Sequence, residues 1–459
     1  MERVSTGISG LDGILRGGVP EGATVLVAGK PGTGKTIFAH QMAFYNSSPG
    51  RKVIYLTTLS EPLIKVMKYQ QEFTFFNFSN FQHNFIYQDL GSLLRNKGPS
   101  GALNAIDDLL KRHEPFLAII DSIKTVFDIL NSSLECREFL VDLSVKLATW
   151  GCTTLLLGEY SEEELDVRPE SAIVDGIIYL YAEDKKQQRR YLRVLKMRGT
   201  GYTGGENILF ITERGIAIFP RVHPKVSAQS YECLTERIST GIAGLDEMTG
   251  GGIPRGTTTL VSSSSGTGKT ILALHYAYAG LCQGENIIYV TFEENPNQIL
   301  YTSANMGISL QPYMQNSQMQ LQHISPIELN VDEHLYHIQK LCGKHGAKRV
   351  IIDSISSFEI GMEDKFKYTD YIWAMTDYFK TRGVSTLLTN EIHASEQAST
   401  ITKHGISYLA DNLLLLRFIE SDMDIKCYLR VIKMRTSHHY TKMREFHIGS
   451  TGVAIGASL

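Results

Sequence analysis

The chain has 459 residues, of which 43% are hydrophobic and 20% are charged. This length exceeds that of one compact core and predicts two or three domains of an ordinary globular protein. The formal net charge of −3 argues against a large basic surface, so nucleic acid is not an expected partner. No apolar run is long enough for a membrane span, the N-terminus lacks the apolar core of a signal peptide, and no two cysteines form a C-x-x-C pair. We therefore expect a cytoplasmic protein with no membrane association, zinc site or disulfide framework.

Near its start the chain carries the segment GKPGTGKT at residues 29–36, which fits G-x-x-x-x-G-K-[ST]. An apolar stretch at 24–28 predicts a strand before it, and the residues that follow predict a helix. In this context the glycines turn backbone N–H groups around phosphate oxygens, the lysine reaches the β- and γ-phosphates and the threonine hydroxyl ligates Mg²⁺. The sequence therefore predicts a nucleotide-phosphate cradle, with the candidate residues Gly32, Thr33, Gly34, Lys35 and Thr36.

This pattern belongs to an internal repeat. Four landmarks return after 232 to 237 residues, namely STGI (5–8 and 239–242), the cradle lysine (Lys35 and Lys269), IIDSI (119–123 and 351–355) and KMR (196–198 and 433–435). Such near-constant spacing indicates a duplicated domain. We expect a first domain over residues 1–222, a linker over 223–237 and a second domain over 238–459.

The second cradle, SSSGTGKT at residues 263–270, has Ser263 where the first glycine stands in the motif. If this position needs a positive φ, serine costs roughly 1–2 kcal/mol there, and we expect weakened geometry in a site that still binds. Its candidate residues are Ser265, Gly266, Thr267, Gly268, Lys269 and Thr270.

Within each half, short apolar strands alternate with helical patterns. In the first half the strand patterns are TVLVA, VIYLT, FLAII and TTLLL, followed by IIYLY and YLRVLKM. Alternation predicts an α/β fold in which a mostly parallel sheet carries helices on both faces and the ligand lies at the carboxyl ends of the strands.

Polar residues end several of these strands. Asp121 and Asp353 each close an apolar strand and precede a serine, the pattern of a carboxylate that holds Mg²⁺ at a phosphate site. Glu159 and Glu391 close later strands, where a polar side chain can sense the γ-phosphate. An isolated glutamate at such a place is more often a solvated strand end.

The halves differ after their second strand. In the second half, Glu293 and Glu294 follow a strand in TFEENP, where a carboxylate can orient or deprotonate a hydroxyl that attacks the γ-phosphate. On spacing alone an exposed acidic loop is an equal alternative. The matching segment of the first half places Leu59 and Ser60 there, with Glu61 one position later.

Taken together, STGI-x-GLD before each cradle, the cradles, TFEE-x-P, IIDSI and KMR resemble the KaiC family, the tandem RecA-like ATPases and autokinases of circadian-type clocks. The resemblance covers nearly the whole chain. It implies two RecA-like P-loop NTPase domains, ATP and Mg²⁺ as ligands, a double-ring homohexamer with ATP between subunits, and a KaiB-like partner on the N-terminal tier.

The resemblance also implies roles for individual residues. Lys196 and Arg198, and likewise Lys433 and Arg435, would reach the nucleotide of the next subunit, which agrees with the absence of an evident partner within their own domain. The family's adjacent Ser-Thr phosphorylation sites fall on Ser407 and Tyr408. Thr402 is a further candidate acceptor.

We interpret the sequence as an ATP-driven hexamer whose second domain carries ATPase and serine/threonine autokinase chemistry, with Lys269, Glu293, Glu294, Asp353, Lys433 and Arg435 as the candidate catalytic set. Two alternatives stay open. One is an ATP-gated signalling scaffold without kinase activity, and the other is a nucleic-acid motor of the RecA or helicase type, which the weak acidity of the chain disfavours.

Overall fold

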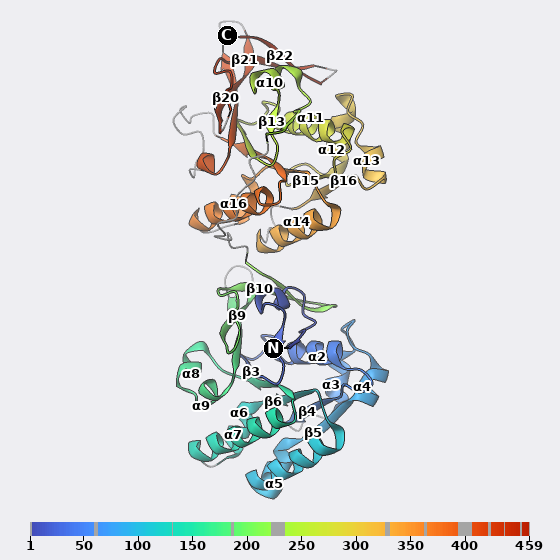
Figure 1. Ribbon diagram of the computed structural model, residues 1–459, viewed down its shortest axis with the longest axis vertical. Helices are drawn as coiled ribbons and strands as arrows, with labels where there is room; N and C mark the ends of the chain where they lie inside the picture. Colours follow the sequence, from blue (N-terminus) through green and yellow to red (C-terminus); the bar gives the residue numbers. More distant parts are fainter. Residues whose placement is uncertain are drawn as a thin grey trace. The chain divides into compact units, whose positions relative to one another are not determined.

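A computed structural model describes residues 2–58, 63–130, 132–184, 188–221, 235–325, 331–361, 365–392, 406–420, 424–435, 437–449 and 452–458. The chain divides into two compact units, Met1–Arg221 and Val222–Leu459 (Figure 1). In the described parts of the chain, no helix combines the length and apolar character that crossing a membrane requires.

The first unit is built on a nine-stranded sheet in the order β11-β10-β9-β8-β3-β7-β6-β4-β5. The strands of this unit are β1 (Arg3–Val4), β2 (Val19–Pro20), β3 (Thr24–Gly29), β4 (Val53–Thr57), β5 (Phe85–Asp89), β6 (Leu117–Asp121), β7 (Thr153–Gly158), β8 (Gly176–Asp184), β9 (Gln188–Met197), β10 (Asn207–Thr212) and β11 (Gly215–Phe219). β1 and β2 form a separate antiparallel pair. The strands from β8 to β5 along the sheet run parallel, whereas β8 to β11 pair antiparallel.

Helices cover both faces of this sheet. They are α1 (Leu11–Ile14), α2 (Lys35–Asn46), α3 (Leu63–Gln70), α4 (Phe78–Asn84), α5 (Leu90–His113), α6 (Ile123–Ile129), α7 (Ser133–Thr149), α8 (Glu162–Val167) and α9 (Pro169–Ile173). Alternate side chains of a strand point to opposite faces, so each sheet contributes to two cores. Val25 and Val27 of β3 lie in the core with α2, and Leu26 and Ala28 lie in the core with α5 and α7.

The second unit repeats this plan with the sheet order β16-β15-β17-β18-β14-β19-β20-β21-β22. Its strands are β12 (Arg237–Ile238), β13 (Ile253–Pro254), β14 (Thr258–Ser263), β15 (Ile287–Thr291), β16 (Met319–His323), β17 (Arg349–Asp353), β18 (Ser385–Glu391), β19 (Asn412–Glu420), β20 (Ile425–Met434), β21 (Arg444–Gly449) and β22 (Gly452–Ser458). Its helices are α10 (Ala243–Met248), α11 (Lys269–Cys282), α12 (Pro296–Asn305), α13 (Gln311–Gln315), α14 (Val331–His345), α15 (Ser357–Gly361) and α16 (Lys365–Lys380), and a 3-10 turn is formed by Ile406–Tyr408.

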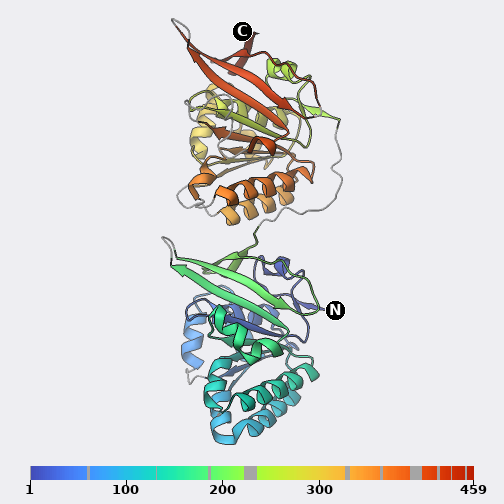
Figure 2. The same cartoon turned by 90° about the vertical axis from the view of Figure 1, so that its left-hand side faces the viewer.

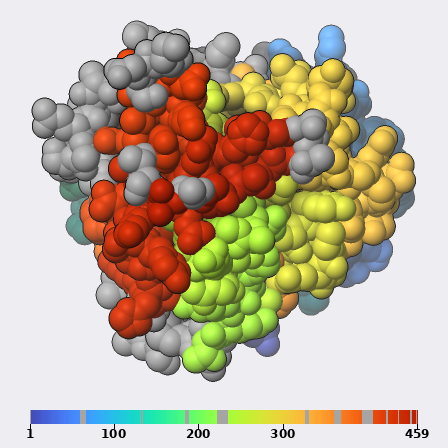
Figure 3. Space-filling model, turned by 90° about the horizontal axis from the view of Figure 1, so that it is seen from above, coloured from blue at the N-terminus to red at the C-terminus, as the bar shows by residue number. Residues whose placement is uncertain are grey.

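In this unit α14 and α16 pack on one face of the sheet, while α11 and α12 pack on the other (Figure 2). The long antiparallel strands β19 and β20 extend the sheet beyond its parallel part, and β21 and β22 follow them. The last strand, β22, packs beside α10, where a Cβ on Gly244 would lie 2.4 Å from the Cβ of Ile455. Figure 3 shows the face on which these red strands meet the green segment that contains α10.

The predicted α/β fold is confirmed in both units. Six strands of each sheet, from β5 to β8 and from β16 to β19, run parallel, and all of their carboxyl ends lie at one edge. Each cradle begins at that edge, directly after the central strand β3 or β14.

Candidate functional site

The first cradle is a tight loop between β3 and α2. Gly32 and Gly34 have φ of 78° and 102°, a backbone region that glycine enters without steric cost. The ammonium of Lys35 folds over the loop and donates to the carbonyl oxygens of Gly29 at 2.9 Å and Lys30 at 3.0 Å. The loop therefore adopts a phosphate-cradle conformation, with its lysine at the centre.

The strand-end aspartate of the first unit lies beside this loop. Thr36 Oγ1 donates to Asp121 Oδ2 at 3.1 Å, and the hydroxyl of Tyr55 donates to the same oxygen at 2.7 Å. Burial lowers the pKa of Lys35, and the nearby carboxylates of Glu159 and Asp121 partly oppose that shift. Hydroxyl and carboxylate oxygens are the donors that Mg²⁺ prefers, so the threonine and aspartate that the sequence singled out fit an Mg²⁺-nucleotide.

The second cradle has the same backbone. Gly266 and Gly268 have φ of 79° and 98°, close to their counterparts in the first unit. Lys269 Nζ donates to the carbonyl oxygen of Ser264 at 3.1 Å, and Ser265, Thr267 and Thr270 occupy the loop and the first turn of α11. At Gly266 a Cβ would meet nothing within 4 Å, as at Gly32 of the first cradle.

We expected weakened geometry at Ser263 because serine would be strained at a positive φ, and the structure does not show that strain. Ser263 is the last residue of β14 and is not among the residues with positive φ, so serine adopts this backbone without the left-handed cost. Its hydroxyl accepts a hydrogen bond from Thr267 Oγ1 within the loop. Thr267 Oγ1 also donates to the carbonyl oxygen of Ser264 at 2.9 Å, as the corresponding Thr33 of the first cradle does to that of Lys30 at 2.9 Å.

Carboxylates gather around Lys269. Asp353 accepts hydrogen bonds from the hydroxyls of Tyr289, at 2.9 Å, and Thr389. Burial lowers the pKa of Lys269, whereas the charges of Glu391, Asp353 and Glu293 raise it. Of the predicted residues of the second site, Lys269, Asp353, Glu293 and Glu391 therefore come together in the fold.

The glutamate pair of TFEENP has two different environments. Glu293 is exposed, and its Oε1 accepts a hydrogen bond from Ser354 Oγ at 3.2 Å. Burial raises the pKa of the half-buried Glu294, and the charges of Asp353 and Glu293 raise it further. A carboxylate with a raised pKa is a stronger base near neutral pH. The first-unit residues Leu59, Ser60 and Glu61 lie outside the described residues.

Sequence reasoning did not identify the tyrosines that hold the strand-end aspartates. Tyr55 and Tyr289 are separated by the same 234 residues as the cradle lysines, within VIYLT and IIYVT. That shared position was the available signal. The first unit also has a buried His40, whose Nδ1 lies 2.9 Å from the carbonyl oxygen of Thr36 and whose Nε2 lies 3.0 Å from the hydroxyl of Tyr87.

The K-x-R pairs do have partners within their own domains, which corrects the sequence-based expectation. Lys196 Nζ donates to the carbonyl oxygens of Val174, at 2.7 Å, and Ser171, at 2.9 Å. Arg198 donates to the carbonyl of Ala172 at 3.1 Å. These carbonyls belong to the C-terminal end of α9 and to the residue after it, where cations are favoured.

The second pair repeats this arrangement on the segment that carries the candidate phosphorylation sites. Lys433 Nζ donates to the carbonyl oxygens of Ser407 at 3.1 Å and Ala410 at 2.7 Å, and Arg435 donates to that of Tyr408 at 2.9 Å. Tyr408 is 55% exposed. The third candidate, Thr402, lies outside the described residues.

This segment lies at the far end of the sheet from its own cradle. Asp411 is bonded to Thr258, the first residue of β14, and the backbone N–H of Arg435 donates to the carbonyl of Asp411. The cradle follows Ser263, the last residue of that strand. At about 3.3 Å per residue, the strand separates the two ends by roughly 17 Å.

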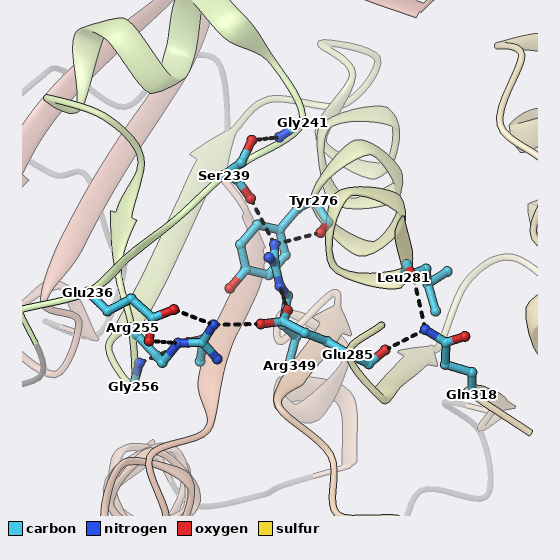
Figure 4. Close-up of polar contacts among 11 residues, drawn as sticks. Glu236, Ser239, Gly241, Arg255, Gly256, Tyr276, Leu281, Glu285, Gln318 and Arg349 are labelled. Carbon is cyan, nitrogen blue, oxygen red and sulfur yellow. Dashed lines mark hydrogen bonds and ion pairs between the residues drawn. The ribbon is translucent and has the colours of Figure 1, made fainter. Parts of the chain in front are cut away.

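A buried ion pair lies at the start of β17, the strand that ends at Asp353 of the second site (Figure 4). Arg349, the first residue of β17, is fully buried and is paired with Glu285. Its Nη1 donates to the carbonyls of Ser239 at 2.8 Å and Tyr276 at 3.0 Å. Because β17 ends at Asp353, this arginine ties the STGI segment and helix α11 to the strand that carries the aspartate.

The network continues toward the segment that joins the two units. Arg255 contacts Glu285 at 2.8 Å and the exposed Glu236 at 2.7 Å. Glu236 directly precedes β12. Glu236, at the start of the described part of the second unit, is thereby linked through Arg255 to the buried pair of Glu285 and Arg349.

Comparison with known proteins agrees with this geometry. The family described as "ATPase: KaiC" matches residues 4–223 and again 238–459. The circadian clock protein KaiC3 of Synechocystis sp. is 27% identical, with 99% of this chain and 92% of the relative covered. The circadian clock oscillator protein KaiC is 27% identical in Picosynechococcus sp. (99% and 90% covered) and 26% identical in Synechococcus elongatus (98% and 88% covered). The chain thus belongs to the KaiC family, with two KaiC-type ATPase domains in tandem.

Proposed function

We propose that this protein is an ATP-dependent autokinase in which both cradles bind ATP and the second domain carries most of the phosphoryl chemistry. The observation that carries the proposal is the difference between the two sites. The second cradle has Glu293 and Glu294 beside Asp353 and Lys269, whereas the first-domain sequence has Leu59 and Ser60 at those positions.

The residues present fit a nucleotide with Mg²⁺. Thr36 with Asp121, and Thr270 with Asp353, supply oxygen donors at the mouths of two glycine-rich loops. Mg²⁺, when bound, would screen the phosphate charge and orient the terminal phosphate. Lys35 and Lys269 would hold the β- and γ-phosphates, and Glu159 and Glu391 stand at the ends of neighbouring strands where they would face the γ-phosphate.

The glutamate pair would supply the base. Glu294, with its raised pKa, would accept a proton from an attacking water or hydroxyl, and Glu293 would tune it through its charge and its bond to Ser354. General-base assistance of this kind is typically worth about 10²–10⁴-fold in rate.

We further propose that Ser407 is phosphorylated by the cradle of a neighbouring subunit. In-line transfer requires an acceptor oxygen at about 3–3.5 Å from the phosphorus, and the strand of roughly 17 Å that separates this segment from its own cradle argues against transfer within one domain. Ser407 keeps the short reach of a serine or threonine acceptor, whereas the oxygen of Tyr408 stands several ångströms farther out. The same placement supports a homohexameric ring in which Lys196, Arg198, Lys433 and Arg435 act on the next subunit's nucleotide.

By similarity to the named relatives, we propose a clock-type or signalling timer in the cytoplasm, with a KaiB-like protein as partner of the first domain. Intact-mass analysis after long incubation with Mg-ATP tests the kinase, and peptide mapping locates the phosphate. A gain of about 80 Da that Ser407→Ala removes and Tyr408→Phe leaves supports the proposal. An unchanged mass leaves the alternative of an ATP-gated scaffold.

A further inference from the structure

The first cradle has a second lysine close to it. Lys124 lies in the first turn of α6, three residues after Asp121, and its Nζ donates to the carbonyl oxygen of Glu159 at 2.9 Å. It also lies 3.8 Å from Glu164 Oε1 and 5.5 Å from the centre of the Tyr160 ring. Its side chain is 36% exposed, so the ammonium stands at the surface and not in the core.

Strand register places the carbonyl that Lys124 binds at the strand end next to the one that Lys35 binds. Strands β3 and β7 are parallel neighbours with Ala28 opposite Gly158. The next residues along the chain are Gly29, which ends β3, and Glu159, which directly follows β7. Lys35 Nζ binds the carbonyl of Gly29. Neighbouring strands lie about 4.8 Å apart, and the two lysines therefore bind adjacent carbonyls at the end of the sheet where the cradle opens.

The second domain has no lysine at this position. Ser356 replaces Lys124 at the same step of 232 residues that relates Asp121 to Asp353. The hydroxyl of Ser356 accepts from the backbone N–H of Glu391 at 2.7 Å, so it ties the same two elements together without a charge. The second cradle has Glu293 and Glu294 instead. The first cradle therefore has an additional positive charge, whereas the second has additional negative charges.

We propose that Lys124 is a second phosphate-binding lysine of the first cradle, which holds the terminal phosphate of a nucleoside triphosphate beside Lys35 and makes nucleotide retention there less dependent on Mg²⁺. The inference rests on the proposed ATP binding by this cradle. A triphosphate carries more charge than the carboxylate of Glu164, and a charge-assisted bond to it is correspondingly stronger. The ammonium then takes over part of the charge screening that the metal supplies.

The consequence is a division of labour between the two domains. The first cradle, with an additional cation and with Leu59 and Ser60 in place of the glutamates, retains nucleotide as a structural ligand. The second, with additional carboxylates around Lys269, repels the phosphates unless Mg²⁺ is present. Removal of Mg²⁺ should therefore empty the second cradle first.

The experiment measures ATP bound to the full-length chain, without and with excess EDTA, by equilibrium binding of radiolabelled ATP. Lys269→Ala isolates binding to the first cradle, and Lys35→Ala isolates binding to the second. We expect EDTA to weaken binding markedly more in the Lys35→Ala protein. In the Lys269→Ala background, Lys124→Ser, which copies the second domain, should lower the affinity in EDTA by about tenfold or more.

Three further variants separate the effect of the charge from that of the local structure. Lys124→Arg should keep the affinity in EDTA, and Lys124→Gln, which retains a donor for the Glu159 carbonyl, should lose it. Ser356→Lys in the Lys35→Ala background should reduce the Mg²⁺ dependence of the second cradle. Equal affinity of Lys124→Ser and its parent in EDTA would overturn the inference while leaving ATP binding intact, and no ATP binding by the Lys269→Ala protein even with Mg²⁺ would overturn both.

Discussion

Gly280 of α11 lies so close to Arg349 that a Cβ on the glycine would stand 2.6 Å from the arginine Nε. In the first domain the position of Gly280 is held by Asn46, whose Nδ2 donates to the carbonyl of Ser5 at 2.8 Å. Arg349 donates to the equivalent carbonyl, that of Ser239, at the same distance. The two domains thus fasten the same STGI segment to the cradle helix with donors from different elements.

This packing predicts the effect of small substitutions on stability. Gly280→Ala should lower the free energy of unfolding by about 1–3 kcal/mol, because the new methyl group displaces a buried ion pair. Gly343→Ala in α14 is the matched control, since a Cβ there meets nothing within 4 Å, and it should stabilise by roughly 0.5–1 kcal/mol. Urea unfolding measures both. Equal effects of the two substitutions would contradict the role of Arg349.

A rescue experiment tests the exchange of donors. Arg349→Leu copies Leu117 of the first domain and should cost about 3–5 kcal/mol, because a buried charged partner of Glu285 is lost. Adding Gly280→Asn should recover part of that loss by supplying a new donor to Ser239. Strictly additive free energies would show that the two positions are independent.

Hydrolysis should belong mostly to the second domain. Replacing Glu293 and Glu294 together by glutamine should lower turnover by about 10²–10⁴-fold, because the base is lost while the cradle is kept. Lys269→Ala should have a similar effect on phosphate release, and Lys35→Ala a smaller one. Turnover that survives the glutamine pair and is lost with Lys35→Ala would assign the activity to the first cradle, with Glu61 as its candidate base.

The two glutamates should also separate in a pH profile. The pKa of Glu294 is raised by burial and by the charges of Asp353 and Glu293, so its proton-accepting form is lost at a higher pH than for an ordinary glutamate. The acidic limb of turnover should therefore lie above 4.5, the ordinary value. Glu293→Gln should move this limb to lower pH, because it removes a negative charge. A limb unchanged by Glu293→Gln would point to a different base.

The first domain should carry a pH-dependent stability of its own. Burial lowers the pKa of His40 from 6.5 to about 4. Between these pH values the imidazole binds a proton in the unfolded chain but not in the folded chain. Stability should be complete above about pH 6.5 and fall by about 3 kcal/mol as pH drops toward 4. The variant His40→Leu with Tyr87→Leu copies Leu274 and Leu321 of the second domain, and urea unfolding across this range should show that the dependence has gone.

Assembly should depend on nucleotide and on the K-x-R pairs. If Arg198 and Arg435 reach the nucleotide of the next subunit, removing ATP or replacing each by alanine should shift the particle from a six-fold ring to smaller species. Sizing by light scattering with and without Mg-ATP measures the shift. Rings that persist without nucleotide in both alanine variants would restrict the pairs to the contacts with α9 and with the segment of Ser407.

The sequence by itself determined the features that repeat along the chain. Gly32 and Gly34 take positive φ, which the glycine-rich motif predicts. The apolar runs predict strands that are buried on both faces, and the aspartates that follow these runs are predicted to lie at strand ends. Each of these features could be predicted from a short segment of sequence. Because the domain is duplicated, each of these patterns occurs twice in the chain and supports the same prediction in both halves. The family resemblance rests on the same segments.

Only the tertiary structure decided how distant residues act on one another. Arg349 appears in the sequence as a charge at the start of a strand, and its pairing with Glu285 exists because the fold brings together two residues that are 64 positions apart in the chain. Lys433, Arg435 and Ser407 likewise lie at the end of the sheet opposite their own cradle because β14 runs between them, a separation that spacing along the chain does not contain. The local sequence pattern determines backbone conformation and burial, whereas the partner of each charged side chain depends on which strands lie next to one another in the sheet.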